Sequence, residues 1–118
     1  MNWKFKEERT FEKRIEESEN ILRKYPSKIP IILEKGIQSL SDLSDLEQRK
    51  YLVPNDITIA QFTFIIRKRL KLKPEDHLYI YFDIQTPLSA QSYMDEIYNK
   101  YADEDKFLYL FYTRELLS

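Results

Sequence analysis

Few side chains in this 118-residue chain could perform chemistry, because it contains one His, one Gly and no Cys. His77 has neither a second His with which to ligate a metal nor a Cys with which to form a nucleophile pair. It precedes an apolar run typical of a strand, so we interpret it as a structural residue. A single Gly also excludes a glycine-rich phosphate-binding loop.

Adjacent carboxylates are the other candidates, because paired acids can act as general acid and base. Glu7 with Glu8, and Glu104 with Asp105, form such pairs, and we expect both pairs on solvated surfaces. We therefore predict no catalytic residue, no metal, no cofactor and a protein that is not an enzyme.

The sharpest charge feature is the run "IRKRLKLK", residues 66–73. It could be a solvated helix end whose cations complement the helix dipole. It could instead bind nucleic acid with the aromatics of "LYIYF", or bind an acidic peptide beside an apolar groove. A net charge of -1 and the acidic cluster at 95–105 weigh against nucleic acid, so the molecule is expected to be electrically lopsided.

The elements that would position this run begin with "KYLVPNDITIAQFTFIIRKRLKL", residues 50–72. We predict a strand, a break at residues 54–56, and a helix opened by a capping box of Thr58 and Gln61. Phe64 and Ile65 fall outside the core-facing stripe and leave surplus apolar surface. That stripe is predicted to be Ile59, Phe62, Ile66 and Leu70.

The other segments alternate between the helical and the strand period. Residues 10–25 predict a helix with apolar positions Phe11, Ile15, Leu22 and Tyr25, and Pro26 ends it. "KIPIILEK", residues 28–35, predicts a strand that is apolar on both faces, and Pro30 indicates a sheet edge or a bulge. Residues 36–48 predict a loop with at most one helical turn. "HLYIYF" and "KFLYLFY" predict strands, and "SYMDEIYNKY" predicts a helix between them.

This order of elements predicts an α+β domain in which helices cover both faces of one sheet. With 42% hydrophobic residues, the chain can form one core, and we expect a single domain over residues 1–118. The absence of Cys fits the cytosol. The charged N-terminal residues predict neither a signal peptide nor a membrane span.

Four stretches resemble the GABARAP-type ubiquitin-like modifiers of autophagy in order and spacing. They are "FKEERTFEKR", "RKYPSKIPIILEK", "KYLVPNDITIAQFTFIIRKRLKL" and "DEDKFLYLFY", and the resemblance covers about residues 3–115. It implies a ubiquitin-like β-grasp with a four-stranded mixed sheet. A long helix would cross one face and two additional N-terminal helices, in an extension of about residues 1–25, would lie on the other. The β-grasp core would span about residues 26–115.

The resemblance also implies a function for the surplus apolar surface. Similar proteins bind short acidic peptides in which an aromatic residue is followed three positions later by Leu, Ile or Val. The peptide adds a strand to a sheet edge. The aromatic pocket would comprise Glu17, Ile21, Pro30, Ile32, Lys50, Leu52 and Phe107. The aliphatic pocket would comprise Tyr51, Val53, Pro54, Ile57, Phe62 and Ile65, and acidic flanks would meet Lys28, Lys50 and Arg69.

The resemblance finally implies conjugation of a C-terminal Gly to phosphatidylethanolamine. The Gly is expected directly after Ser118, where this sequence ends, so the chain as written is expected not to be conjugated. The expected protein is a cytoplasmic monomer that is recruited to autophagosomal membranes when lipidated. The loop at 36–47 is longer than usual, and "FDI" replaces an Asn-containing turn. Alternatives are a non-lipidated trafficking adaptor and a nucleic-acid-binding domain of the same fold.

Overall fold

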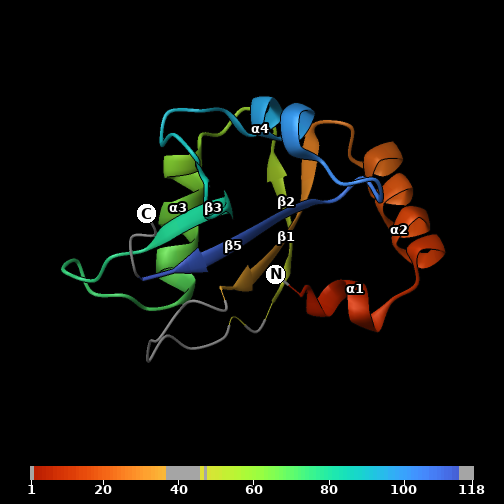
Figure 1. The fold of residues 1–118 in the computed structure, drawn as a ribbon. Helices are drawn as coiled ribbons and strands as arrows, with labels where there is room; N and C mark the ends of the chain where they lie inside the picture. Colours follow the sequence, from red (N-terminus) through yellow and green to blue (C-terminus); the bar gives the residue numbers. More distant parts are fainter. Residues whose placement is uncertain (1, 37–45, 47, 115–118) are drawn as a thin grey trace.

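The protein was analysed as a computed structural model, which describes residues 2–36, 46 and 48–114 (Figure 1). The predicted loop at 36–48 and the C-terminal tail fall largely outside these residues. The elements in chain order are α1 (Lys4–Glu8), α2 (Phe11–Lys24), β1 (Lys28–Lys35), β2 (Lys50–Pro54), α3 (Ile59–Arg69), β3 (Tyr79–Asp83), β4 (Thr86–Pro87), α4 (Met94–Tyr101) and β5 (Leu108–Thr113).

One mixed sheet organises the fold, with strand order β2-β1-β5-β3-β4. β1 and β5 are parallel at its centre, whereas β2 pairs antiparallel with β1 and β3 pairs antiparallel with β5. These are the four main strands that the resemblance predicts. β4 adds only two residues beside β3, after an irregular register between Tyr81 and Asp83. The arrangement is a ubiquitin-like β-grasp.

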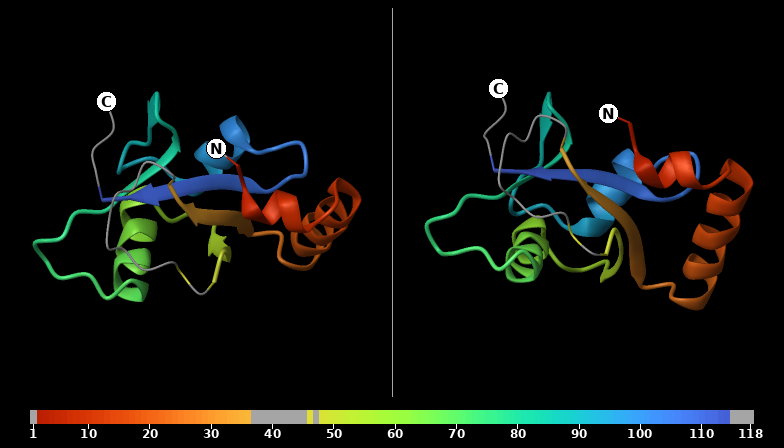
Figure 2. Two further views of the ribbon diagram at one scale, coloured as in Figure 1. Left: turned by 60° about the horizontal axis from the view of Figure 1, so that its bottom comes forward. Right: turned by 90° about the horizontal axis from the view of Figure 1, so that it is seen from below.

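Both faces of the sheet are covered, as the doubly apolar strands predict. α1 and α3 lie on opposite sides of the sheet (Figure 2). The larger apolar cluster contains Ile31 of β1, Phe62 of α3 and Met94 of α4. The smaller cluster, on the opposite face, contains Phe5 of α1 and Ile32 of β1. Neighbouring residues of β1 therefore serve opposite cores because strand side chains alternate between faces.

The prediction that Pro30 marks a sheet edge is wrong, because β1 lies between β2 and β5. The amide of Leu33 donates to the carbonyl of Arg49, which fixes the alternation of hydrogen-bonded pairs along β1 and β2. Pro30, opposite Leu52, therefore occupies a position without ladder hydrogen bonds to β2. Its nitrogen faces the β5 side, where pairing begins only at Ile31, so the internal strand tolerates the missing donor.

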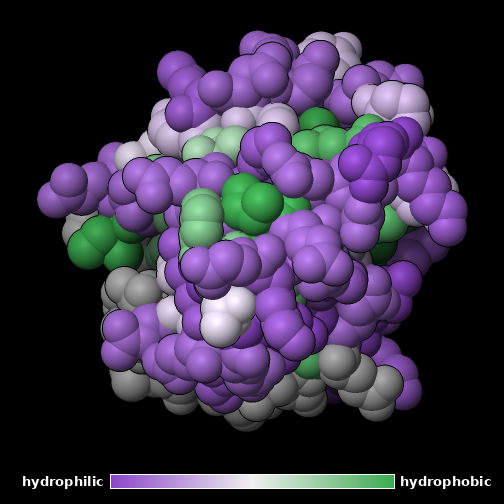
Figure 3. Space-filling view, turned by 90° about the vertical axis from the view of Figure 1, so that its right-hand side faces the viewer, coloured by the Kyte–Doolittle hydropathy of each residue, from purple (hydrophilic) through white to green (hydrophobic). Residues whose placement is uncertain are grey.

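The inner face of α2 is partly polar, because the buried Arg14 and Ser18 share it with Ile21, which packs against the smaller cluster. Phe11 and Tyr25 are 43% and 39% exposed, whereas Arg14 and Ser18 are buried. The predicted solvation of Asp105 is also wrong, because its side chain is fully buried against Arg14. Seen from the side of α2, the surface is mainly hydrophilic, with scattered apolar residues (Figure 3).

α3 forms as predicted. Thr58 and Gln61 make the capping box, and Ile59, Phe62 and Ile66 are buried. Leu70 packs against the same core at the end of the helix. Among the described residues, no helix is long and apolar enough to cross a membrane.

The end of α3 generates a prediction about stability. The amides of Lys71 and Leu72 donate to the carbonyls of Lys68 and Arg67, the pattern of a Schellman cap. Lys71 has a φ of 56°, a conformation that Gly adopts without steric cost. We expect Lys71→Gly to stabilise the protein by about 0.5–1 kcal/mol in chemical denaturation, because relief of this strain exceeds the entropy that Gly adds to the unfolded chain.

Lys68→Gly is the matched control, because Lys68 lies inside the same helix. We expect it to destabilise the protein by about 1 kcal/mol. Destabilisation by both substitutions would contradict the assignment of Lys71 to the cap.

Candidate functional site

The candidate site is built on β2, which forms one edge of the sheet. One side of β2 pairs with β1, and no strand among the described residues pairs with the other side. Residues 51 and 53 direct their backbone groups to β1, so those of Lys50 and Leu52 point outward. The Lys50 carbonyl accepts a hydrogen bond from the side chain of Gln48, which confirms its outward direction. The outward edge of β2 is therefore a template for another strand.

The side chains of β2 alternate between the two faces of the sheet. Tyr51 and Val53 are 4% and 5% exposed and belong to the core beneath α3. Leu52 points to the face that carries α2 and remains 38% exposed. The two predicted pockets therefore lie on opposite faces of one edge strand.

The aromatic-pocket residues come from α2, β1, β2 and the segment before β5. Ile32 and Phe107 are fully buried in the smaller cluster, and Ile21 of α2 packs against that cluster. Glu17 of α2 forms an ion pair with Lys50 of β2. This pair bridges the helix and the edge strand, so a ligand between them must compete with it. Pro30 is buried on β1 beside Leu52.

The aliphatic-pocket residues lie between β2 and α3. Tyr51 contacts Phe62 edge-to-face, with ring centroids 6.1 Å apart, and Ile57 packs against the same core. Ile65 is 38% exposed, although the next residue, Ile66, is fully buried. Pro54, which ends β2, is half-buried. Ile65 stands on α3 between Phe62 and Arg69, which both contact the Tyr51 ring of β2. We therefore expect Ile65 to provide apolar surface beside the edge without being required in the core.

Three cations surround the edge. Lys28 lies opposite Pro54 at one end of β2, and Lys50 begins the strand at the other end. The Arg69 guanidinium lies 5.5 Å from the centroid of the Tyr51 ring. Burial raises the pKa of the Tyr51 hydroxyl, although the charge of Arg69 opposes the shift. The site therefore combines apolar residues with positive charge at both ends.

The rest of the basic run does not form one continuous face. Arg67 donates to the carbonyls of Lys73 and Asp76, which fixes the segment after α3. The Lys68 ammonium lies 4.5 Å from the centroid of the Phe64 ring, and Arg69 faces Tyr51. Arg67, Lys68 and Arg69 thus make three different contacts within the protein. This disfavours a nucleic-acid-binding surface, which needs several cations aligned toward one phosphate backbone.

Sequence reasoning missed the buried polar cluster that positions α2. Arg14 Nε lies 3.0 Å from Asp105 Oδ2, and the Tyr109 hydroxyl donates to the same carboxylate. The Ser18 hydroxyl donates to the Asp105 carbonyl at 2.6 Å, and the Phe107 amide donates to Asp105 Oδ1 at 3.0 Å. Arg14 and Ser18 stand four positions apart, a spacing that places both on one helix face and was the available signal.

Burial sets the protonation of this cluster. It raises the pKa of Asp105, whereas the hydrogen bond from Tyr109 opposes the shift. Burial, with the negative charge of Asp105, also raises the pKa of Tyr109 far above its usual range. Tyr109 therefore remains a hydrogen-bond donor. No group of three or more metal-ligating side chains occurs in the described part of the chain.

Comparisons with known proteins agree with this fold. Residues 13–117 match the family model described as "Autophagy protein Atg8 ubiquitin like". The chain is 46% identical to autophagy-related protein 8 of Mycosarcoma maydis over 111 residues, covering 94% of this chain and 92% of the relative. It is also 46% identical to autophagy-related protein 8 of Aspergillus niger over 115 residues, covering 98% and 95%.

A solved structure gives the same result. The crystal structure of Trypanosoma brucei ATG8 superposes with a TM-score of 0.89 at 39% identity, covering 96% of this chain and 95% of that one. The fold defines a ubiquitin-like protein. The chain belongs to the Atg8 family of autophagy ubiquitin-like modifiers, a family of modifiers and adaptors rather than catalysts.

Two neighbouring isoleucines generate a prediction about the faces of α3. Ile66→Ala should destabilise the protein by about 2–5 kcal/mol, because it leaves a cavity in the core. Ile65→Ala should cost less than about 1 kcal/mol, because its side chain is partly solvated. Denaturant unfolding of the two variants measures this difference. Equal losses of stability would show that the faces of α3 are assigned wrongly.

Proposed function

We propose that this protein is an autophagy adaptor that binds acidic peptides carrying an aromatic anchor and, three positions later, Leu, Ile or Val. The peptide pairs with the outward edge of β2, as in β-augmentation. The observation that carries the proposal is the open edge of β2, with an exposed Leu52 on one face and an exposed Ile65 beside the other.

The anchor spacing follows from strand geometry. Side chains three positions apart in a strand point to opposite faces, because the side-chain period is two. A peptide paired with β2 would therefore direct its aromatic anchor toward α2 and its aliphatic anchor toward α3. These are the faces that hold Glu17, Ile21 and Leu52 on one side, and Tyr51, Val53 and Ile65 on the other.

The preference for acidic flanks follows from the charges around β2. Lys28 and Arg69 are available to carboxylates of the peptide near the two ends of the edge strand. Lys50 is paired with Glu17, so an acidic group of the peptide would exchange with an internal carboxylate. Such an exchange adds little affinity but fixes orientation and speeds association.

We expect a dissociation constant of micromolar order for such a peptide. Two anchors that each bury about 150–200 Å² contribute about 8 kcal/mol at about 25 cal/mol/Å², and strand hydrogen bonds offset the ordering of the peptide. Isothermal titration calorimetry measures the constant, and NMR shifts at Leu52 and Ile65 locate the binding. Absence of both heat and shifts at millimolar protein would contradict the adaptor function.

Ile65→Ala and Phe64→Ala form a matched pair for this titration. Phe64 is 58% exposed on another flank of α3, outside the predicted pockets. Ile65→Ala should lower the affinity for the peptide about tenfold, whereas Phe64→Ala should leave this affinity unchanged.

We also propose that the protein is cytoplasmic and is recruited to autophagic membranes by conjugation of a C-terminal Gly to phosphatidylethanolamine. Membership of the Atg8 family supports this proposal. The conjugation enzymes would pass the terminal carboxyl through a narrow cleft, where a residue without Cβ leaves the backbone unhindered.

The polypeptide ending at Ser118 and the same polypeptide extended by one Gly test the conjugation. We expect only the extended form to yield a lipid conjugate with the family's conjugation enzymes, visible as a gel shift after incubation with liposomes containing phosphatidylethanolamine. Conjugation of the form ending at Ser118 would show that the reactive residue is not a Gly directly after Ser118. No conjugation of either form would favour an adaptor that acts without lipidation.

A further inference from the structure

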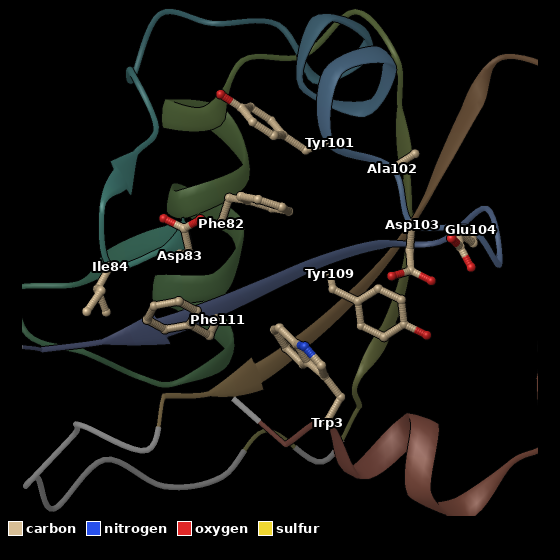
Figure 4. Close-up of a pocket in the computed structure, with 10 residues that line it drawn as sticks. All are labelled: Trp3, Phe82, Asp83, Ile84, Tyr101, Ala102, Asp103, Glu104, Tyr109 and Phe111. Carbon is tan, nitrogen blue, oxygen red and sulfur yellow. The ribbon is translucent and has the colours of Figure 1, made fainter.

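A second site lies away from β2, in a pocket of about 540 Å³ (Figure 4). Its walls come from the start of the chain, from β3 and the turn after it, from the end of α4 and from β5. Neither the proposed peptide edge nor the core uses this space. Its volume lies in the range of ligand-binding pockets.

Aromatic residues make up half of the lining. The rings of Trp3 and Tyr109 lie 5.2 Å apart, and those of Phe82 and Tyr101 are stacked at 4.5 Å. Phe111 of β5 lies to one side of these two pairs, near Ile84 and Asp83, in the close-up (Figure 4). Aromatic faces carry negative electrostatic potential and attract cations, most strongly at Trp.

The charged side chains of the lining are all acidic. Asp83, Asp103 and Glu104 contribute carboxylates, and no Lys, Arg or His is among the described residues that line the pocket. Asp83 accepts a hydrogen bond from the Gln85 amide, but neither Asp83 nor Glu104 forms an ion pair with a described residue. Their charge is therefore available to a cationic ligand.

The protein's own Lys6 demonstrates this chemistry. Its ammonium lies 4.6 Å from the centroid of the Tyr109 ring and 2.8 Å from Asp103 Oδ1. Although burial opposes the shift, the hydrogen bond from Lys6 lowers the pKa of Asp103. One internal cation thus combines an aromatic face with a carboxylate, while Trp3, Phe82, Asp83 and Glu104 remain for a second cation.

We propose that this pocket docks a basic partner peptide through an arginine side chain. A guanidinium can stack on the aromatic walls and pair with the free carboxylates, whereas an acidic or neutral segment would be repelled or gain less. The site lies apart from the β2 edge and has the opposite charge preference. The proposal for this pocket therefore does not depend on whether β2 binds acidic peptides.

Trp3 supplies a direct readout, because it is the only Trp in the chain and lines the pocket. The probe is a short blocked peptide with one central arginine, titrated into the full chain while Trp3 fluorescence is recorded. We expect a saturable change with the arginine peptide and a much weaker response to its citrulline counterpart, which keeps the shape but loses the charge.

The variant Asp83→Asn with Glu104→Gln removes the charge of the two carboxylates that form no ion pair with a described residue, and Lys6–Asp103 is left intact. We expect this variant to lower the affinity for the arginine peptide about fivefold. Glu16→Gln is the matched control, because Glu16 is an exposed acid on α2 that does not line the pocket. It should leave the affinity unchanged.

Three results would overturn the proposal: no saturable response at millimolar peptide, equal binding of the citrulline peptide, or unchanged affinity in the double variant. Phosphatidylcholine vesicles are tested in parallel. A Trp3 response to vesicles that exceeds the response to the peptide would assign the pocket to a lipid surface instead. Prior saturation with the acidic peptide of the β2 edge should not reduce the arginine response, which separates the two sites.

Discussion

The buried contact between Arg14 and Asp105 joins the N-terminal helices to the β-grasp. Asp105 is fully buried, and its carboxylate meets Arg14 from α2 and Tyr109 from β5. Such a pair contributes little net stability, because desolvation of the two charges offsets their attraction. Removal of either partner is costly, however, because the other charge stays buried and unpaired. The pair therefore specifies where α2 lies more than it stabilises the fold.

The position of α2 shapes the proposed binding edge. Glu17 pairs with Lys50 of the edge strand, and Ile21 packs against the smaller cluster. Both lie on the helix that Arg14 and Ser18 hold against Asp105, in the turn before β5. The opposite end of the sheet differs, because β4 has two residues and includes Pro87, which lacks an amide donor. A short strand with Pro is a poor template for pairing. The β2 edge is thus the better template for a further strand, and the pocket lined by Trp3 lies elsewhere.

Much of the fold was predictable because local chemistry and packing agree in α3 and β1. The capping box at Thr58 and Gln61 and the stripe through Phe62 and Ile66 predict a helix whose buried face the structure confirms. The exposure of Ile65 followed from the same periodicity. The alternating faces of β1 were predictable for the same reason, since both sets of side chains are apolar.

Other features depend on tertiary partners that local patterns do not encode. Asp105 looks like a surface acid in "DEDK" until Arg14, far away in the sequence, is brought against it. Pro30 suggests a sheet edge, but its position in the hydrogen-bond alternation depends on the register with β2. The second pocket, which Trp3 lines, brings together residues from near the two ends of the sequence. No periodicity within one element could reveal it.

The geometry of β2 makes anchor spacing the most direct test of the account. Acidic peptides in which the aliphatic anchor follows the aromatic anchor three, four or two positions later can be compared by calorimetry under identical conditions. Strand pairing at β2 predicts strong binding only at a spacing of three, because an even spacing directs both anchors to one face of the sheet. Equal affinity at all three spacings would contradict docking along this edge.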